Sequence, residues 1–195
     1  IARTNSNDQL NTYNKLARLQ LEELNDREGA IDSYRKMFII DAQYTEAVTA
    51  LDRLYREDQR WDELKEIYEQ YLERAPNADH TMVRLVLSEL SEMVHHDETT
   101  AREQAIAYLL PIIEVNPQHL DALSRLSLLN GQLGRWADCV QYMSAELEFI
   151  NEIHAKIEKM YHLGMVHLEH LEAPHEAIEW MKRALELNPS YSPAM

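Results

Sequence analysis

The sequence predicts an all-α protein, a right-handed α-solenoid of about five helix pairs followed by the start of a sixth. The 195-residue chain contains only 4 Gly and 6 Pro, so helices joined by short turns can occupy most of its length. Hydrophobic residues make up 45% of the chain, which is enough for a substantial core, and they recur at helical spacing. Small residues also return at a fixed interval, which indicates a repeated unit.

The repeat is clearest in three Ala-Ile pairs, which begin at Ala30, Ala105 and Ala177. Their separations in the sequence are 105 − 30 = 75 and 177 − 105 = 72. A shorter step lies inside the larger one, because Leu64 follows Ala30 at a separation of 64 − 30 = 34 and Cys139 follows Ala105 at 139 − 105 = 34. This shorter step is the basic period, and its length suits two amphipathic helices and their turns.

We place the five units and the truncated start of a sixth at about residues 8–43, 44–77, 78–118, 119–151, 152–189 and 190–195. The helix pairs expected within them are 9–24 with 27–40, 44–57 with 60–74, 79–96 with 100–115, 119–132 with 135–150, and 152–171 with 174–187. Each helix is predicted from an apolar stripe, and each boundary from residues that interrupt it. In the second unit, Leu51 and Tyr55 share one stripe, "REDQR" turns the chain, Leu64 and Ile67 share the next stripe, and Pro76 ends it.

These units resemble the tetratricopeptide repeat, whose sparse signature is Trp-x2-Leu-Gly-x2-Tyr, then Ala-x3-Phe, a further Ala and a late Pro. The matching residues are Leu51, Tyr55, Leu64, Tyr68, Tyr71 and Pro76 in the second unit, and Leu163, Gly164, Ala177, Met181, Ala184 and Pro189 in the fifth. The resemblance covers about residues 8 to 195. It implies that small residues lie where two helices approach closely and that large residues fill the space between them.

The other units depart from the signature in identifiable places. Ala17 and Ala42 replace the Gly and the Pro in the first unit, and Asn130 and Asn151 replace an aromatic residue and the Pro in the fourth. In the third unit, "HHDETT" is expected to lengthen a loop. The segment "RWDELKEIYEQYLERAPN" also resembles half-a-TPR repeats, but the Ala-Ile units and the regular shorter step favour the tetratricopeptide repeat.

The Arg-Trp dipeptide occurs twice, at Trp61 and Trp136, and 136 − 61 = 75 repeats the larger step. Each Trp is expected at the start of a second helix, where it would cover the seam between its own helix pair and the next. Arg60 and Arg135 are expected to keep these turns in water. The alternative, an aromatic side chain that grips a ligand, stays open.

Composition and motifs exclude several classes of function. The net charge of −15 opposes nucleic-acid binding and association with anionic membranes, although basic partners remain compatible with it. The single cysteine, Cys139, excludes a disulfide framework and is expected to fill a small core position. No nucleotide-binding loop, nucleophile motif or zinc-protease motif is present, so we expect no enzyme activity and no cofactor. The nine His residues are scattered, and we expect no metal site.

A stacked array of helix pairs forms a concave surface lined mainly by first helices, which is the expected binding surface. The candidate partner-binding residues are Glu46, Thr49, Arg53, Arg56, Ser124, Leu128, Tyr161 and Met165. Arg53 and Arg56 lie one turn apart and could hold a carboxylate, or could instead pair with Glu57 or Asp52. One tetratricopeptide subclass grips a chain-terminal carboxylate with Lys and then Asn four residues later, and this pattern is missing from the first unit.

We therefore predict a non-catalytic scaffold that binds a peptide or a folded protein of unknown identity on its concave face. Two alternatives stay open: a partner-recruiting region of a larger enzyme, and an array that self-associates through its ends. The sequence begins with Ile1 rather than Met, and we expect it to be a fragment of a longer protein. We leave the localisation unassigned, with a cytoplasmic setting favoured.

Overall fold

A computed structural model describes residues 2–94 and 97–191, with side chains from residue 6 onward, and over these residues it contains ten helices and no strand. The chain forms two compact units, Ile1–Val94 and His95–Met195, which are described separately below. The all-α prediction is confirmed. The predicted start of a sixth helix pair at 190–195 lies almost wholly outside the described residues.

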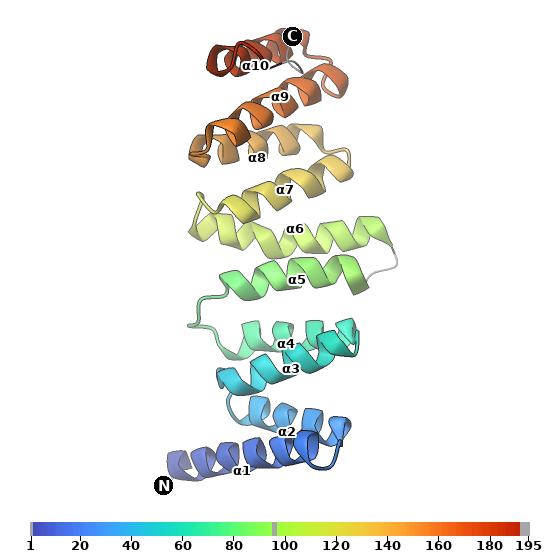
Figure 1. Cartoon of the computed structure of the whole chain (residues 1–195), viewed down its shortest axis with the longest axis vertical. Helices are drawn as coiled ribbons and strands as arrows, with labels where there is room; N and C mark the ends of the chain where they lie inside the picture. Colours follow the sequence, from blue (N-terminus) through green and yellow to red (C-terminus); the bar gives the residue numbers. More distant parts are fainter. Residues whose placement is uncertain (1, 95–96, 192–195) are drawn as a thin grey trace. The chain divides into compact units, whose positions relative to one another are not determined.

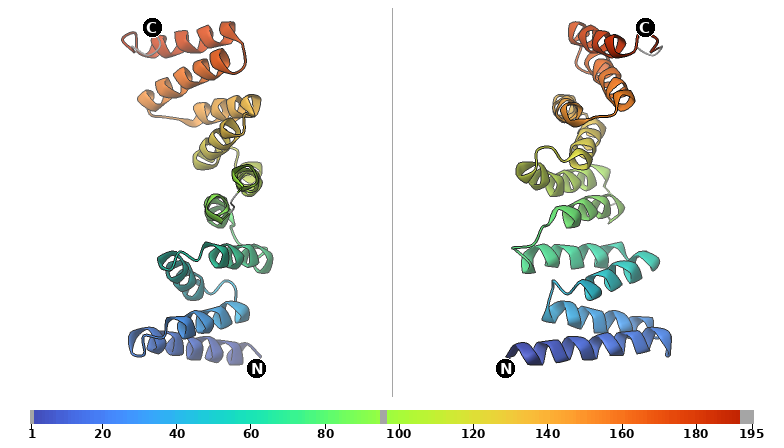
Figure 2. Two further views of the ribbon diagram at one scale, coloured as in Figure 1. Left: turned by 90° about the vertical axis from the view of Figure 1, so that its right-hand side faces the viewer. Right: turned by 60° about the vertical axis from the view of Figure 1, so that its left-hand side comes forward.

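Unit 1 contains five helices: α1 (Ala2–Glu22), α2 (Arg27–Ile40), α3 (Thr45–Glu57), α4 (Trp61–Arg74) and α5 (Thr81–Val94). Unit 2 contains α6 (Glu98–Val115), α7 (Leu120–Gln132), α8 (Trp136–Phe149), α9 (Ile153–Glu169) and α10 (Pro174–Leu187). Within each unit, every helix runs antiparallel to the next and packs against it (Figures 1 and 2). The predicted third helix pair falls on the boundary, because α5 packs on α4 and α6 packs on α7.

The first helix begins at Ala2, well before the predicted start at residue 9. Residues 2–8, "ARTNSND", contain no apolar stripe, so the hydrophobic pattern could not reveal them as helix. Extending a helix that has already formed adds one hydrogen bond per residue without a new nucleation step. The polar segment can therefore continue α1 although its sequence carries no apolar stripe.

The core of unit 1 is built from the predicted stripes. Tyr55, Phe38, Met37 and Leu51 are among the largest fully buried side chains, and they belong to α2 and α3. Ala30 is fully buried at the start of the stripe on α2. A large side chain there would hold the helices apart, whereas Ala lets them pack closely and leaves the space to larger neighbours.

The close approach of α9 and α10 depends on a glycine. A Cβ atom at Gly164 would lie 3.1 Å from Cγ of Met181 and 3.2 Å from the backbone oxygen of Ala177. Ala177 and Ala184 on α10 are both buried. These contacts confirm that small residues of the repeat signature lie where two helices meet.

The two Arg-Trp turns are joined by ion pairs to an earlier helix of the same compact unit. Arg60 forms an ion pair with Glu28 at the start of α2, with 2.7 Å between Nη1 and Oε1. Arg135 forms the corresponding pair with Glu103 on α6. The two glutamates are separated by 103 − 28 = 75 and the two arginines by 135 − 60 = 75, so the glutamate partner is repeated together with the turn.

Trp136 covers the seam predicted for it. Its ring stacks on the His170 ring at the end of α9, with 3.6 Å between centroids and 3° between planes. Trp136 also packs against the cluster that contains Cys139, whose thiol is buried and free. Burial raises the pKa of that thiol, which fits a packed side chain rather than a reactive nucleophile.

None of the helices among the described residues is both long and apolar enough to cross a membrane. Among those residues, no three His, Cys, Asp or Glu side chains are grouped so that they could hold a metal ion. His95 and His96 lie outside the described residues.

Candidate functional site

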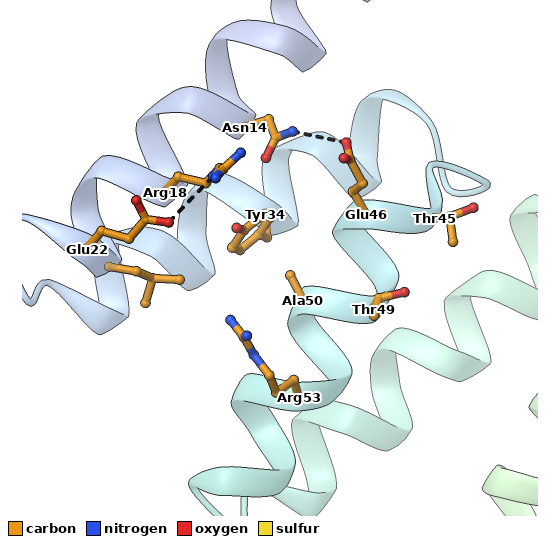
Figure 3. A pocket seen from close by; sticks show the side chains of 10 residues that line it. Asn14, Arg18, Glu22, Tyr34, Thr45, Glu46, Thr49, Ala50 and Arg53 are labelled. Atoms are coloured by element: carbon orange, nitrogen blue, oxygen red, sulfur yellow. Dashed lines mark hydrogen bonds and ion pairs between the residues drawn. The ribbon is translucent and has the colours of Figure 1, made fainter.

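A groove of about 580 Å³ opens on unit 1 between α1 and α3, with α2 beneath it (Figure 3). We call it the unit-1 groove, and its lining residues are Asn14, Arg18, Leu21, Glu22, Tyr34, Thr45, Glu46, Thr49, Ala50 and Arg53. The helices α1 and α3 are the first helices of the first two predicted units. The groove therefore lies on the kind of surface for which a binding role is expected.

Helical spacing explains why these side chains face the same space. Asn14 and Arg18 are one turn apart on α1, and Thr49 and Arg53 are one turn apart on α3. Tyr34 reaches the groove from α2 and is only 5% exposed. The groove thus has a nearly buried aromatic floor and two polar walls.

One end of the groove is closed by a hydrogen-bonded glutamate. The Glu46 carboxylate accepts a hydrogen bond from Nδ2 of Asn14 at 3.0 Å and another from the hydroxyl of Tyr44 at 2.6 Å. The hydrogen bond to Glu46 raises the pKa of Tyr44, so this hydroxyl remains a donor. Glu46 is thereby fixed as a link between α1 and α3.

The middle of the groove holds two arginines with weak partners. Nε of Arg18 lies 3.6 Å from Glu22, and Nε of Arg53 lies 3.9 Å from Glu57. Glu57 is held more closely by Arg27, at 2.9 Å, which explains its long distance to Arg53. Neither Arg18 nor Arg53 donates a hydrogen bond to any residue that the structure describes.

Tyr34 lies between these two guanidinium groups (Figure 3). Burial raises the pKa of Tyr34, and the positive charges of Arg53 and Arg18 act in the opposite direction. The charges of both arginines therefore reach the same hydroxyl. Within the described part of the chain, the Tyr34 hydroxyl has no hydrogen-bond partner.

Arg56, the second arginine of the predicted pair, lies outside this lining. Its Nε donates to both carboxylate oxygens of Asp52, at 2.9 and 3.0 Å. The Tyr68 hydroxyl donates to the same carboxylate at 2.9 Å. The sequence had left open pairing with Glu57 or Asp52, and for Arg56 the structure shows pairing with Asp52. This leaves Arg53 and Arg18, rather than Arg53 and Arg56, facing one groove.

Unit 2 contains a second groove of about 510 Å³ over the predicted residues Ser124 and Leu128. We call it the unit-2 groove, and its remaining lining residues are Ser127, Gly131, Gln132, Trp136, Cys139, Met143, Lys159 and His162. Lys159 forms an ion pair of 2.7 Å with Glu146, which links α9 to α8, and both side chains are mostly buried. The cation in this groove is therefore already neutralised, unlike those in the unit-1 groove.

The last two predicted residues lie on α9 and do not line the unit-2 groove. Tyr161 is half-buried, and its ring meets the edge of Tyr191 with 6.0 Å between centroids. It packs with the cluster around Ile157 and Ala184, so much of its surface contributes to the α9–α10 contact. Met165 is half-buried on the same helix.

Arg18 and Tyr34 were not predicted from the sequence as lining residues. A signal for Arg18 exists, because its separation from Arg53, 53 − 18 = 35, is close to one repeat length. The two arginines thus occupy similar positions in successive units. Nothing comparable marks Tyr34, since its place beneath the groove depends on how α2 packs under α1 and α3.

Comparison with known proteins identifies the repeat directly in one part of the chain. Residues 160–191 match a model of the tetratricopeptide repeat. No curated protein matches the chain by sequence.

Solved structures extend the comparison to the whole chain. A crystal structure of the MamA protein is 20% identical over 95% of each chain, with a TM-score of 0.60. A structure of YrrB, described as a TPR protein with an unusual peptide-binding site, is 19% identical over 93% of this chain and 88% of its own, with a TM-score of 0.58. MamA residues 41–end from Desulfovibrio magneticus RS-1 is 15% identical over 94% and 97%, with a TM-score of 0.57.

At these identities the structures establish a shared fold rather than a shared role. The repeat match at 160–191 and the fold of the solved relatives agree with the residue pattern in the sequence. Residues 160–191 thus contain a tetratricopeptide repeat, and the chain as a whole shares its fold with solved structures that include a tetratricopeptide repeat protein.

Proposed function

We propose that this chain is a non-catalytic interaction scaffold that binds a peptide segment of a partner protein in the unit-1 groove. The observation that carries the proposal is the groove itself, which has a nearly buried aromatic floor and arginines without close partners in its wall. Polar groups that converge on a concave surface without internal partners are typical of a binding site.

Two further observations support a peptide as the ligand. The groove is open along α1 and α3, so it suits an extended peptide better than a small molecule, which usually binds in an enclosed pocket. A structure with a similar fold, YrrB, is described as having a peptide-binding site. We propose Ser124 and Leu128, on the unit-2 groove, and Tyr161 and Met165 as the partner contacts of unit 2.

The test is selection of random peptides on the 195-residue chain and on a variant whose groove is filled. Thr49→Trp places a large ring in the lining from a position on α3. We expect peptides selected on the natural sequence to lose binding to this variant. Glu73→Trp is the matched control, because Glu73 is on α4 and does not line the groove.

The control should retain every selected peptide, and circular dichroism should show that both variants are folded. Retention of the same peptides by Thr49→Trp would show that the groove is not where they bind. Selection that enriches no peptide at all would contradict the proposed function itself.

A further inference from the structure

We infer that the unit-1 groove recognises a carboxylate of the partner peptide, held between Arg18 and Arg53 above the Tyr34 hydroxyl. This inference rests on the proposed function and specifies the partner's chemistry. It concerns three side chains from three helices, α1, α2 and α3, that face one space (Figure 3).

The three side chains offer hydrogen-bond donors that the fold does not use. A guanidinium group has five N–H donors in a planar fork that matches a carboxylate. Arg18 and Arg53 direct none of theirs to a described residue within hydrogen-bonding distance, and their nearest acids are 3.6 and 3.9 Å away. Their side chains are 66% and 62% exposed, so an incoming anion can reach them.

Two other arginines of the same unit, one on α2 and one on α3, do have close acidic partners. Arg27 makes close contacts with Glu57 and Asp58 at 2.9 and 2.7 Å, and Arg56 makes two with Asp52. Acidic residues outnumber basic ones in this chain, 34 to 19, so an arginine can usually find a partner. Arg18 and Arg53, which flank Tyr34, have only distant acidic partners.

The acids that also line the groove favour a carboxylate over a phosphoryl group. Glu22 and Glu46 place two negative charges beside the two arginines. A phosphorylated side chain carries a charge of about −1.5 to −2 at neutral pH, so those glutamates would repel it more strongly than a singly charged carboxylate. The same glutamates should favour a basic residue in the peptide next to the acidic one.

The experiment uses four synthetic peptide libraries on the immobilised 195-residue chain. Three have amidated ends and a central residue fixed as Glu, Gln or phosphoserine, and the fourth has central Gln and a free C-terminal carboxylate. We expect the Glu library to be retained about tenfold more than the amidated Gln library, as befits a charge-assisted hydrogen bond at a solvated site. The ratio should fall as salt is added, because the site is exposed.

Arg18→Gln/Arg53→Gln should reduce the Glu-to-Gln ratio to about one. Arg35→Gln is the control, since Arg35 already contacts Glu66 at 2.9 Å and does not line the groove, and it should keep the ratio. Thermal melts of each variant verify folding. Selective retention of the free-carboxylate library would support the site and identify a chain end as the source of the anion.

Equal retention of the Glu library and both Gln libraries, abolished by Thr49→Trp, would overturn the carboxylate site and leave the proposed function standing. Stronger retention of the phosphoserine library would also overturn it, in favour of a phosphoryl ligand. If no library is retained, the proposed function fails as well.

Discussion

The ion pair between Glu146 and Lys159 provides a sharp test of how unit 2 is held together. It joins α8 to α9 at 2.7 Å, with side-chain exposures of 10% for Glu146 and 19% for Lys159. Replacing the acid in Glu146→Leu removes the partner and leaves the ammonium group in a largely apolar seam. We expect this variant to be clearly less stable than the natural chain.

The burial of the two side chains sets the size of the effect. Removing one partner of a fully buried ion pair costs about 3 to 5 kcal/mol, whereas an exposed pair contributes about 0 to 1 kcal/mol. Lys159 keeps some access to water and can turn its ammonium group outward, so we expect a loss of about 2 to 3 kcal/mol. Glu146→Leu/Lys159→Met removes both charges together and should lie within about 1 kcal/mol of the natural chain.

The assay is urea unfolding of the natural chain, both single variants and the double variant, followed by far-ultraviolet circular dichroism. The four free energies of unfolding form a double-mutant cycle, and we expect a coupling energy of about 2 kcal/mol. Equal slopes of free energy against urea are required, because repeat arrays can unfold in parts. A coupling below about 0.5 kcal/mol would show that solvent, and not Glu146, stabilises the ammonium group.

Three further predictions concern buried polar groups and close packing. The Tyr55 hydroxyl is buried without a hydrogen-bond partner among the described residues. In urea unfolding, Tyr55→Phe should therefore be as stable as the natural chain or more stable by up to about 1 kcal/mol. A loss of more than about 1 kcal/mol would show that the hydroxyl has a partner. Tyr68→Phe removes the hydrogen bond to Asp52 and should cost about 1 kcal/mol in the same assay. Burial, and then the Asp52 charge, raises the pKa of Tyr68. The stability that this hydroxyl contributes is therefore complete below about pH 10 and declines as the pH rises further. In alkaline melts, the natural chain should lose more stability than Tyr68→Phe does. Gly164→Ala should destabilise the chain by about 1 kcal/mol, because its new Cβ atom would press on α10. At Gly131 a Cβ atom meets only ordinary contacts, so Gly131→Ala should be neutral or stabilising. Equal shifts in melting temperature for the two variants would contradict the packing argument.

The sequence alone was sufficient for the helices and for the all-α fold. Apolar stripes and turn residues are local signals, so they place helices to within a few residues wherever the helix has a core-facing side. Small residues such as Ala30 and Gly164 could be assigned to close contacts because the same spacing recurs along the chain. The polar start of α1 was missed because it carries no such stripe.

Only the tertiary structure decided which charged side chains meet. Arg53 and Arg56 are equivalent by helical spacing, yet Arg56 is bound to Asp52 while Arg53 faces the unit-1 groove with Arg18. Several acids lie within reach of many arginines in so acidic a chain, and the packing of neighbouring helices selects among them. Tyr34 enters the site for the same reason, because its hydroxyl lies between two guanidinium groups only when α1, α2 and α3 are packed together.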